Sequence, residues 1–252
     1  MNPIVFISGA GSGIGAATAL KFAQHNYPVI LCGRRADKLE AVQRKILDSG
    51  GRAHILQLDI RDLAKVNEAI RGLPEDWREV RILINNAGLA VGLSTIDEGD
   101  PDDWDRMIDT NVKGLLYLSR ALLPGMIERK QGHIVNIGSI AGKEAYLKGN
   151  VYCATKHAID GLTRAMRMDL VQHGIRVTQV APGAVETEFS QVRFKGDDEK
   201  AKAVYKGYKP LQAGDVADVI FYAVSLPEHV CINDLVVMPT AQANTVHWNK
   251  QS

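Results

Sequence analysis

Tyr152 and Lys156 have the residue types and the spacing of a proton-transfer site. They are four residues apart, so in a helix they lie on one face. The ordinary pKa of tyrosine, about 10, is too high for efficient proton exchange near neutral pH, and a neighbouring ammonium lowers it. Ser139 follows an apolar run typical of a strand, at the edge where open α/β sheets bind ligands. The Tyr–Lys spacing alone is weak evidence, because it often occurs by chance on helix surfaces.

The stretch Ser8–Gly15 offers a place for a pyrophosphate. It follows the apolar run Ile4–Ile7 and precedes a helical pattern. Glycine lets the backbone come close to a ligand, and the start of a helix presents free N–H groups and a positive dipole end. Gly9, Gly13 and Gly15 are spaced G-x-x-x-G-x-G, which differs from the commonest dinucleotide fingerprint. A glycine-rich turn with no ligand is the alternative.

These segments together resemble the short-chain dehydrogenase/reductase family over essentially the whole chain. The matching segments are Ser8–Gly15, with Ser8 in place of the family's threonine, Asn85–Gly88, Ser139, Tyr152–Lys156 and Pro182–Thr187. The resemblance implies a doubly wound, Rossmann-like α/β fold with a seven-stranded parallel sheet and helices on both faces. We expect one domain over residues 1–252, with a substrate lid at 184–210 and a C-terminal tail at 239–252.

The resemblance also implies the catalytic roles. Tyr152 is expected to act as general acid in carbonyl reduction and as base in alcohol oxidation. Lys156 is expected to tune Tyr152 and bind the cofactor ribose, and Ser139 to hydrogen-bond the substrate oxygen. Asn111, inside an apolar helical stripe, is expected to hold a water that links Lys156 to solvent; a cross-helix hydrogen bond is the alternative.

Arg34 and Arg35 indicate NADP as the cofactor. They stand about 20 residues after the glycines, where an NAD enzyme has an acid for the ribose 2′-hydroxyl. Asp37, with Glu40 three residues later, has the pattern of a helix N-cap, which leaves both arginines free to bind a 2′-phosphate. Two solvated loop arginines are the alternative. The expected cofactor-binding residues are Gly9, Gly11, Ser12, Gly13, Ile14, Gly15, Arg34, Arg35, Asp59, Ile60, Asn86, Ala87, Gly88, Tyr152, Lys156, Pro182, Gly183, Val185 and Thr187.

Four further segments resemble the branch of the family that acts on serine and other 3-hydroxy acids. They are Leu73–Trp77, Met107–Asn111, Glu188–Asp197 and Asn233–Leu235. The resemblance implies oxidation of L-serine, L-allo-threonine or 3-hydroxypropionate-like acids, or reduction of malonic semialdehyde.

A free carboxylate on such a substrate requires a cation, for which we expect Arg193, with Lys195 second; a solvated loop is the alternative. The substrate residues are thus Ser139, Tyr152 and Arg193. A reductase of a 3-oxoacyl thioester or bulkier ketone, and a regulatory protein that binds NADP(H) without turnover, remain open.

Composition favours a soluble protein of the cytoplasm, and the resemblance implies an enzyme with a small-molecule substrate. The net charge is +1, and no apolar run approaches the roughly 20 residues of a membrane span, so we expect no nucleic-acid or membrane partner. The chain leaves no room for a signal peptide before the first strand, and its three cysteines lack zinc or redox spacing. We expect no metal site. By resemblance the protein forms a homotetramer, with the tail at subunit contacts.

Cys153 and His157, four residues apart in the same helix as Tyr152, present one rival site. A thiolate–imidazole pair could act as a nucleophile. Nothing nearby offers an orienting third group, so a buried structural thiol beside a surface histidine is favoured.

Overall fold

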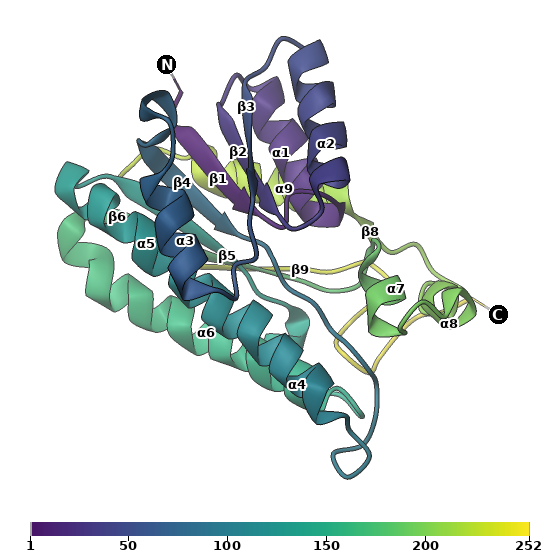
Figure 1. Cartoon of the computed structure of the whole chain (residues 1–252). Coiled ribbons are helices and arrows are strands. Elements are labelled where there is room, and N and C mark those ends of the chain that lie inside the picture. The colour runs from purple at the N-terminus through teal and green to yellow at the C-terminus, as the bar shows by residue number, and fades with distance from the viewer. Residues whose placement is uncertain (1, 252) are drawn as a thin grey trace.

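The computed structural model describes residues 2–251 and is built on a seven-stranded parallel sheet (Figure 1). Residues 1 and 252 of the expected domain lie outside the described residues. The strand order is β3-β2-β1-β4-β5-β6-β9. The strands are β1 (Ile4–Ser8), β2 (Val29–Gly33), β3 (Ala53–Gln57), β4 (Val80–Asn85), β5 (Gly132–Ile137), β6 (Ile175–Pro182) and β9 (Asp234–Val237).

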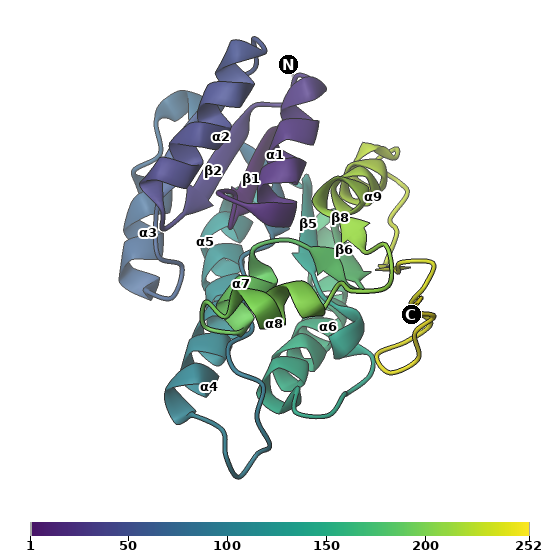
Figure 2. The ribbon, with the colours of Figure 1, turned by 90° about the vertical axis from the view of Figure 1, so that its right-hand side faces the viewer.

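Helices cover both faces of the sheet (Figures 1 and 2). On one face lie α1 (Gly13–Gln24), α2 (Ala36–Asp48) and α9 (Ala213–Ser225); on the other lie α3 (Leu63–Arg71), α5 (Gly114–Arg129) and α6 (Asn150–Leu170). In residues 2–251 no helix combines the length and the apolar character needed to span a bilayer. The doubly wound sheet expected from the sequence is confirmed.

Strand β1 shows why the sequence forms a sheet that is buried on both sides. Val5 and Ile7 belong to the core beneath α1, α2 and α9, whereas Ile4 and Phe6 belong to the core beneath α3, α5 and α6. A strand in this position must be apolar at every residue, so its sequence is a continuous apolar run instead of an alternating one.

The order of the strands determines where a ligand can bind. From β1 the chain proceeds outward to β2 and β3, then crosses back to place β4 on the other side of β1. The loops that leave β1 and β4 therefore diverge at the carboxyl edge of the sheet, and such a switch point opens a crevice in α/β folds.

A capped helix precedes the segment that contains Asn111. Asp100 caps α4 (Pro101–Ile108) by accepting a hydrogen bond from the amide of Asp102 at 3.1 Å, and Pro101 occupies the first turn. Between α4 and α5 the chain forms one π-helical turn, η2 (Asp109–Lys113), which contains the buried Asn111. Single π turns of this kind are frequent at functional sites.

The cap expected at Asp37 is wrong. Helix α2 begins at Ala36, so Arg35 takes the N-cap position without a side-chain cap and Asp37 lies in the first turn. There its carboxylate still interacts favourably with the positive end of the helix dipole.

The expected lid and tail lie beside each other near the carboxyl edge (Figure 2). The lid contains β7 (Val185–Glu186), α7 (Phe189–Arg193) and α8 (Asp198–Ala203), and β7 pairs with β8 (Leu211–Gln212). The tail holds both ends of the lid, because the Gln242 side chain accepts a hydrogen bond from the amide of Ala184 and the amide of Gln251 donates to the carbonyl of Gly207.

We predict that His133 makes the stability of the protein depend on pH. Its ring is buried on β5, 2.8 Å from the Thr178 hydroxyl, and burial lowers its pKa from 6.5 to about 3. Between pH 6.5 and pH 3, His133 is therefore protonated in the unfolded chain and neutral in the folded protein. The resulting stability is full above pH 6.5 and is lost as the pH falls toward 3.

The measurement is urea unfolding at several pH values. Between pH 7 and pH 4.5, His133→Gln should lose roughly 2 kcal/mol less unfolding free energy than the unsubstituted protein. The exposed His229 provides the control, and His229→Gln should behave as the parent does. Parallel curves for His133→Gln and the parent would contradict the prediction.

Candidate active site

The glycine turn connects β1 to α1 and requires glycine at three positions. Gly9 and Gly13 have φ angles of +68° and +52°, which favour glycine. A Cβ on Gly15 would lie 2.2 Å from the carbonyl oxygen of Gly9, so no side chain fits there. The turn therefore brings the first turn of α1, and its free N–H groups, to the edge of the sheet.

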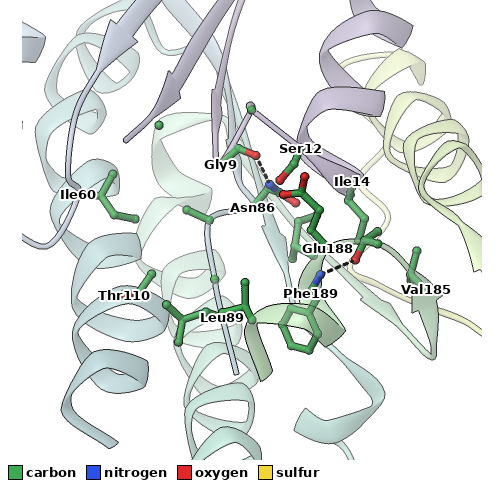
Figure 3. Close-up of a pocket in the computed structure, with 18 of the residues that line it drawn as sticks. Gly9, Ser12, Ile14, Ile60, Asn86, Leu89, Thr110, Val185, Glu188 and Phe189 are labelled. Carbon is green, nitrogen blue, oxygen red and sulfur yellow. Dashed lines mark hydrogen bonds between the residues drawn. The ribbon is translucent and has the colours of Figure 1, made fainter. Parts of the chain in front are cut away.

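Ser8 and Asn86 connect this turn to the end of β4. The Ser8 hydroxyl accepts hydrogen bonds from the amides of Asn86 and Ala87 at 3.1 and 3.0 Å. The Asn86 side chain donates to the carbonyls of Ser8 and Gly9 at 2.9 and 3.2 Å (Figure 3). The hydroxyl that Ser8 shares with threonine is thus the part of the side chain that the fold uses.

Asn85, which precedes these residues, is part of the buried core. Its side chain donates to the Ser119 hydroxyl at 3.0 Å and to the side-chain oxygen of Asn136 at 2.9 Å. Asn136 in turn donates to the Thr163 hydroxyl at 2.9 Å. This network joins β4, β5, α5 and α6 and holds the central strands together beneath the site.

A cavity of about 510 Å³ opens at this edge, a size typical of ligand sites (Figure 3). Every expected cofactor-binding residue lines it except Gly15, which lies behind Gly9. Ser139 also lines the cavity, whereas Asn111 and Arg193 do not. The structure therefore brings together in one cavity segments that are far apart in the sequence. Lining residues that the sequence analysis did not identify include Leu89, Arg106, Thr110, Glu188, Phe189 and Val192.

The basic end of the cavity suits a phosphate group. Arg35 donates from Nη2 to the Ser12 hydroxyl at 3.0 Å, and Arg34 lines the same wall. Asp59 is held by Arg61, whose Nη2 lies 2.6 Å from Oδ2, and these hydrogen bonds lower the pKa of the Asp59 carboxyl. A glycine cradle, a helix N-terminus and two arginines fit a dinucleotide that carries a 2′-phosphate.

Ser139, Tyr152 and Lys156 meet at the far end of the cavity. Ser139 follows β5 and accepts a hydrogen bond from the amide of Ala141 at 3.1 Å, and all three side chains are buried. The Lys156 ammonium donates to the carbonyl of Ile137 at 2.9 Å and lies 5.9 Å from the centre of the Tyr152 ring.

Burial dominates the acid–base properties of Tyr152. Burial, followed by the neighbouring Tyr146, raises the pKa of Tyr152, while hydrogen bonding to Ser139 and the charge of Arg193 oppose the increase. The net shift in the protein alone is therefore upward, and the expected tuning of Tyr152 by Lys156 stays a prediction. Desolvation disfavours the phenolate more strongly than the surrounding charges and dipoles stabilise it.

Burial acts on Lys156 in the opposite direction. It lowers the pKa of the ammonium from 10.5 to about 8. Lys156 is therefore mostly charged at neutral pH and loses its proton in mildly alkaline solution.

Asn111 has a complete set of hydrogen bonds inside the protein. Its oxygen accepts from the amide of Leu89 at 2.8 Å, and its nitrogen donates to the carbonyl of Leu89 and the hydroxyl of Thr155 at 2.8 and 3.0 Å. The cross-helix hydrogen bond expected as the alternative is present. A role in a proton relay stays a prediction.

Arg193 lies beside Tyr152 and is partly buried. Its guanidinium is 5.2 Å from the Tyr146 ring centre and 5.6 Å from that of Tyr152, and it donates to the Tyr146 hydroxyl. Its Nε is buried and has no hydrogen-bond partner within residues 2–251. Lys195, the second expected cation, is held 2.7 Å from the buried Asp103 carboxylate.

The Cys153–His157 pair does not form a nucleophilic site. His157 Nδ1 lies 2.9 Å from the backbone carbonyl of Cys153, so this ring nitrogen interacts with the backbone and not with the thiol. Cys153 itself is buried among apolar neighbours.

Comparison with known proteins gives consistent results. The short chain dehydrogenase family profile matches residues 3–198. The NADP-dependent 3-hydroxy acid dehydrogenase of Escherichia coli (strain K12) is 44% identical over 241 residues, 95% of this chain and 96% of that one. Sulfoacetaldehyde reductase 2 of Chromohalobacter salexigens is 46% identical over 244 residues, 96% of each chain.

A solved structure of serine dehydrogenase in its closed form, complexed with NADP+, superposes with a TM-score of 0.93. It is 42% identical, and the match covers 99% of this chain and 100% of that one. Sequence profile, sequence identity and three-dimensional structure therefore agree: the chain belongs to the short-chain dehydrogenase/reductase family.

Proposed function

We propose that this protein is an NADP(H)-dependent oxidoreductase that interconverts a short 3-hydroxy acid and its 3-oxo partner. The observation that carries the proposal is the convergence of Ser139, Tyr152 and Lys156 on the cavity that also contains the glycine turn and Arg35. The cofactor supplies the hydride chemistry when bound. L-Serine, L-allo-threonine, 3-hydroxypropionate and malonic semialdehyde define the substrate class.

In the reductive direction Tyr152 donates its proton to the substrate oxygen, and the hydroxyl of Ser139 hydrogen-bonds that same oxygen. The raised pKa of Tyr152 keeps the proton in place until the oxygen becomes basic. The nearby Lys156 ammonium stabilises the phenolate that forms. In the oxidative direction the same tyrosine accepts the proton.

Arg193 is our candidate for binding the substrate carboxylate. Its charge is next to Tyr152, and its buried Nε is free to donate within the described part of the chain. Lys195 is the weaker candidate because Asp103 already neutralises it. A sulfonate would suit the same cation, and a relative is a sulfoacetaldehyde reductase, so sulfoacetaldehyde is the second substrate candidate.

We further infer a cytoplasmic homotetramer. The three cysteines are free, which suits a reducing compartment. An apolar groove runs along α5 and α6 and exposes Leu116, a surface suited to packing against a second copy. The tail, expected at subunit contacts, packs against its own chain but leaves Val246 exposed for an additional contact.

We predict that Tyr152→Phe abolishes turnover while it preserves cofactor binding. Removing the proton donor should decrease kcat by about 10³-fold, within the range for general acid–base catalysis. The measurement is absorbance at the nicotinamide band, with NADP and NAD tested against L-serine, L-allo-threonine, 3-hydroxypropionate and sulfoacetaldehyde. An acetoacetyl thioester and a simple secondary alcohol complete the panel. A parent protein that binds NADPH and turns over none of them would instead be a regulatory protein.

We predict an alkaline limb in the pH profile of reduction that belongs to Lys156. With cofactor saturating, kcat/KM for the oxo acid should be level below pH 8 and fall above it, because the ammonium that stabilises the Tyr152 phenolate is lost near its pKa of about 8. Lys156→Arg keeps a charge at all these pH values. The Lys156→Arg variant should be less active, but the decrease in kcat/KM near pH 8 should disappear. If the decrease remains near pH 8, it belongs to another group.

We predict that Arg193→Gln selectively impairs anionic substrates. The loss of a charge-assisted hydrogen bond should decrease kcat/KM for the hydroxy acid by about 10- to 100-fold. Turnover of the neutral secondary alcohol should decrease much less, because it loses only the effect of the Arg193 charge on Tyr152. Lys200→Gln, which removes an exposed charge from α8, is the matched control. Equal losses on charged and neutral substrates would mean that Arg193 only supports the lid.

A further inference from the structure

An ion pair joins the two walls of the cofactor cavity across its opening. Arg35, at the start of α2, donates from Nη2 to Oε2 of Glu188 at 2.9 Å. The two residues are 153 positions apart in the sequence, and both line the cavity. Glu188 belongs to the lid and Arg35 to the nucleotide-binding half, so this contact spans the space through which a dinucleotide enters.

The cationic side of the pair is held in place by the glycine turn. Arg35 also donates to the Ser12 hydroxyl at 3.0 Å, and Lys38 extends its ammonium to 3.7 Å from Oε1 of Glu188. A Cβ on Gly11 would lie 3.1 Å from Cβ of Lys38, so the lysine stem rests against the turn. Figure 3 shows the Glu188 carboxylate close to Ser12.

The anionic side of the pair is rigidly connected to the catalytic end of the cavity. Glu188 is the N-cap residue of α7, and the amide of the next residue, Phe189, donates to the Thr187 hydroxyl at 3.3 Å. The Phe189 ring packs edge-on against Tyr152, with 5.7 Å between ring centres. A movement of Glu188 away from Arg35 therefore also moves the ring that covers the catalytic tyrosine.

The charges allow this pair to persist when a phosphate group binds. Arg35 holds the pKa of the Glu188 carboxyl below its usual range, so the carboxylate is charged at neutral pH. Arg34, Arg35 and Lys38 supply three positive charges along this wall. Glu188 contributes one negative charge and a 2′-phosphate contributes about two. The three cations are therefore balanced when the Glu188 carboxylate and the phosphate are both present.

We propose that Glu188, Arg35 and Lys38 form a latch that closes the lid over bound NADP(H) and sets the rate at which the cofactor leaves. The inference rests on the proposed function, because it takes NADP(H) as the occupant of the cavity. Glu188 acts as a positioning residue: it holds the lid, and through Phe189 it holds the cover of the catalytic site.

Stopped-flow fluorescence of NADPH, recorded without substrate, measures the dissociation rate directly. Glu188→Gln removes the charge and keeps the size, and should release NADPH about two- to fivefold faster, the range for an exposed ion pair. The dissociation constant should increase by the same factor. Glu186→Gln is the matched control, because it neutralises an exposed carboxylate of β7 that accepts a hydrogen bond from Gln212 and, within the described residues, forms no ion pair with Arg35 or Lys38. It should leave the rate unchanged.

Ionic strength provides a second readout. Salt screens exposed charges, so added salt should accelerate release from the parent protein more than from Glu188→Gln. Lys38→Gln, which removes the more distant partner, should accelerate release less than Glu188→Gln does. Unchanged or slower release of NADPH from Glu188→Gln would overturn the latch. Slower release would mean that the Glu188 carboxylate competes with the cofactor phosphates for the cations. A parent protein that does not bind NADPH would instead overturn the proposed function.

Discussion

The close contact between the glycine turn and the end of β4 is the constraint on which the site depends. Gly15 leaves no space for a Cβ against the Gly9 carbonyl, and Asn86 donates to that same carbonyl. The Ser8 hydroxyl completes the contact by accepting hydrogen bonds from the amides of Asn86 and Ala87, which follow β4. Any side chain at Gly15 would separate β1 from β4 and widen the crevice that their diverging loops create. The loops after β1 and β4, at the topological switch point of the sheet, therefore form the base of the cavity.

Burial of the catalytic groups has a cost and a benefit. It disfavours the charged form of both side chains, which raises the pKa of Tyr152 and lowers that of Lys156. The same exclusion of water makes the hydrogen bonds and charges around the tyrosine stronger than they are in solvent. The tyrosine therefore retains its proton at neutral pH, while Ser139, Lys156 and Arg193 are all near enough to stabilise the phenolate once it forms.

Sequence reasoning identified most of the local signals, and it missed contacts between residues far apart in the chain. The glycine turn and the Tyr152–Lys156 spacing each lie within one strand–turn–helix unit or one helix, so their pattern specifies the geometry. Glu188 and Lys38 were missed because their significance comes from a contact with residues on the opposite wall of the cavity. The cap at Asp37 was misplaced because helix α2 begins at Ala36, two residues before the start that a cap at Asp37 implies.

Under the proposed function, Arg193 would connect substrate binding to the acid–base chemistry of Tyr152. Its positive charge is one of the influences that oppose the increase in the Tyr152 pKa. A carboxylate bound to Arg193 would neutralise that charge and raise the pKa of Tyr152 further, so the tyrosine would keep its proton until the substrate oxygen becomes basic. A neutral alcohol leaves the charge of Arg193 in place. Under the proposed function, the residue that binds the acidic substrate would also adjust the pKa of Tyr152, because both effects act through the same guanidinium 5.6 Å from the Tyr152 ring.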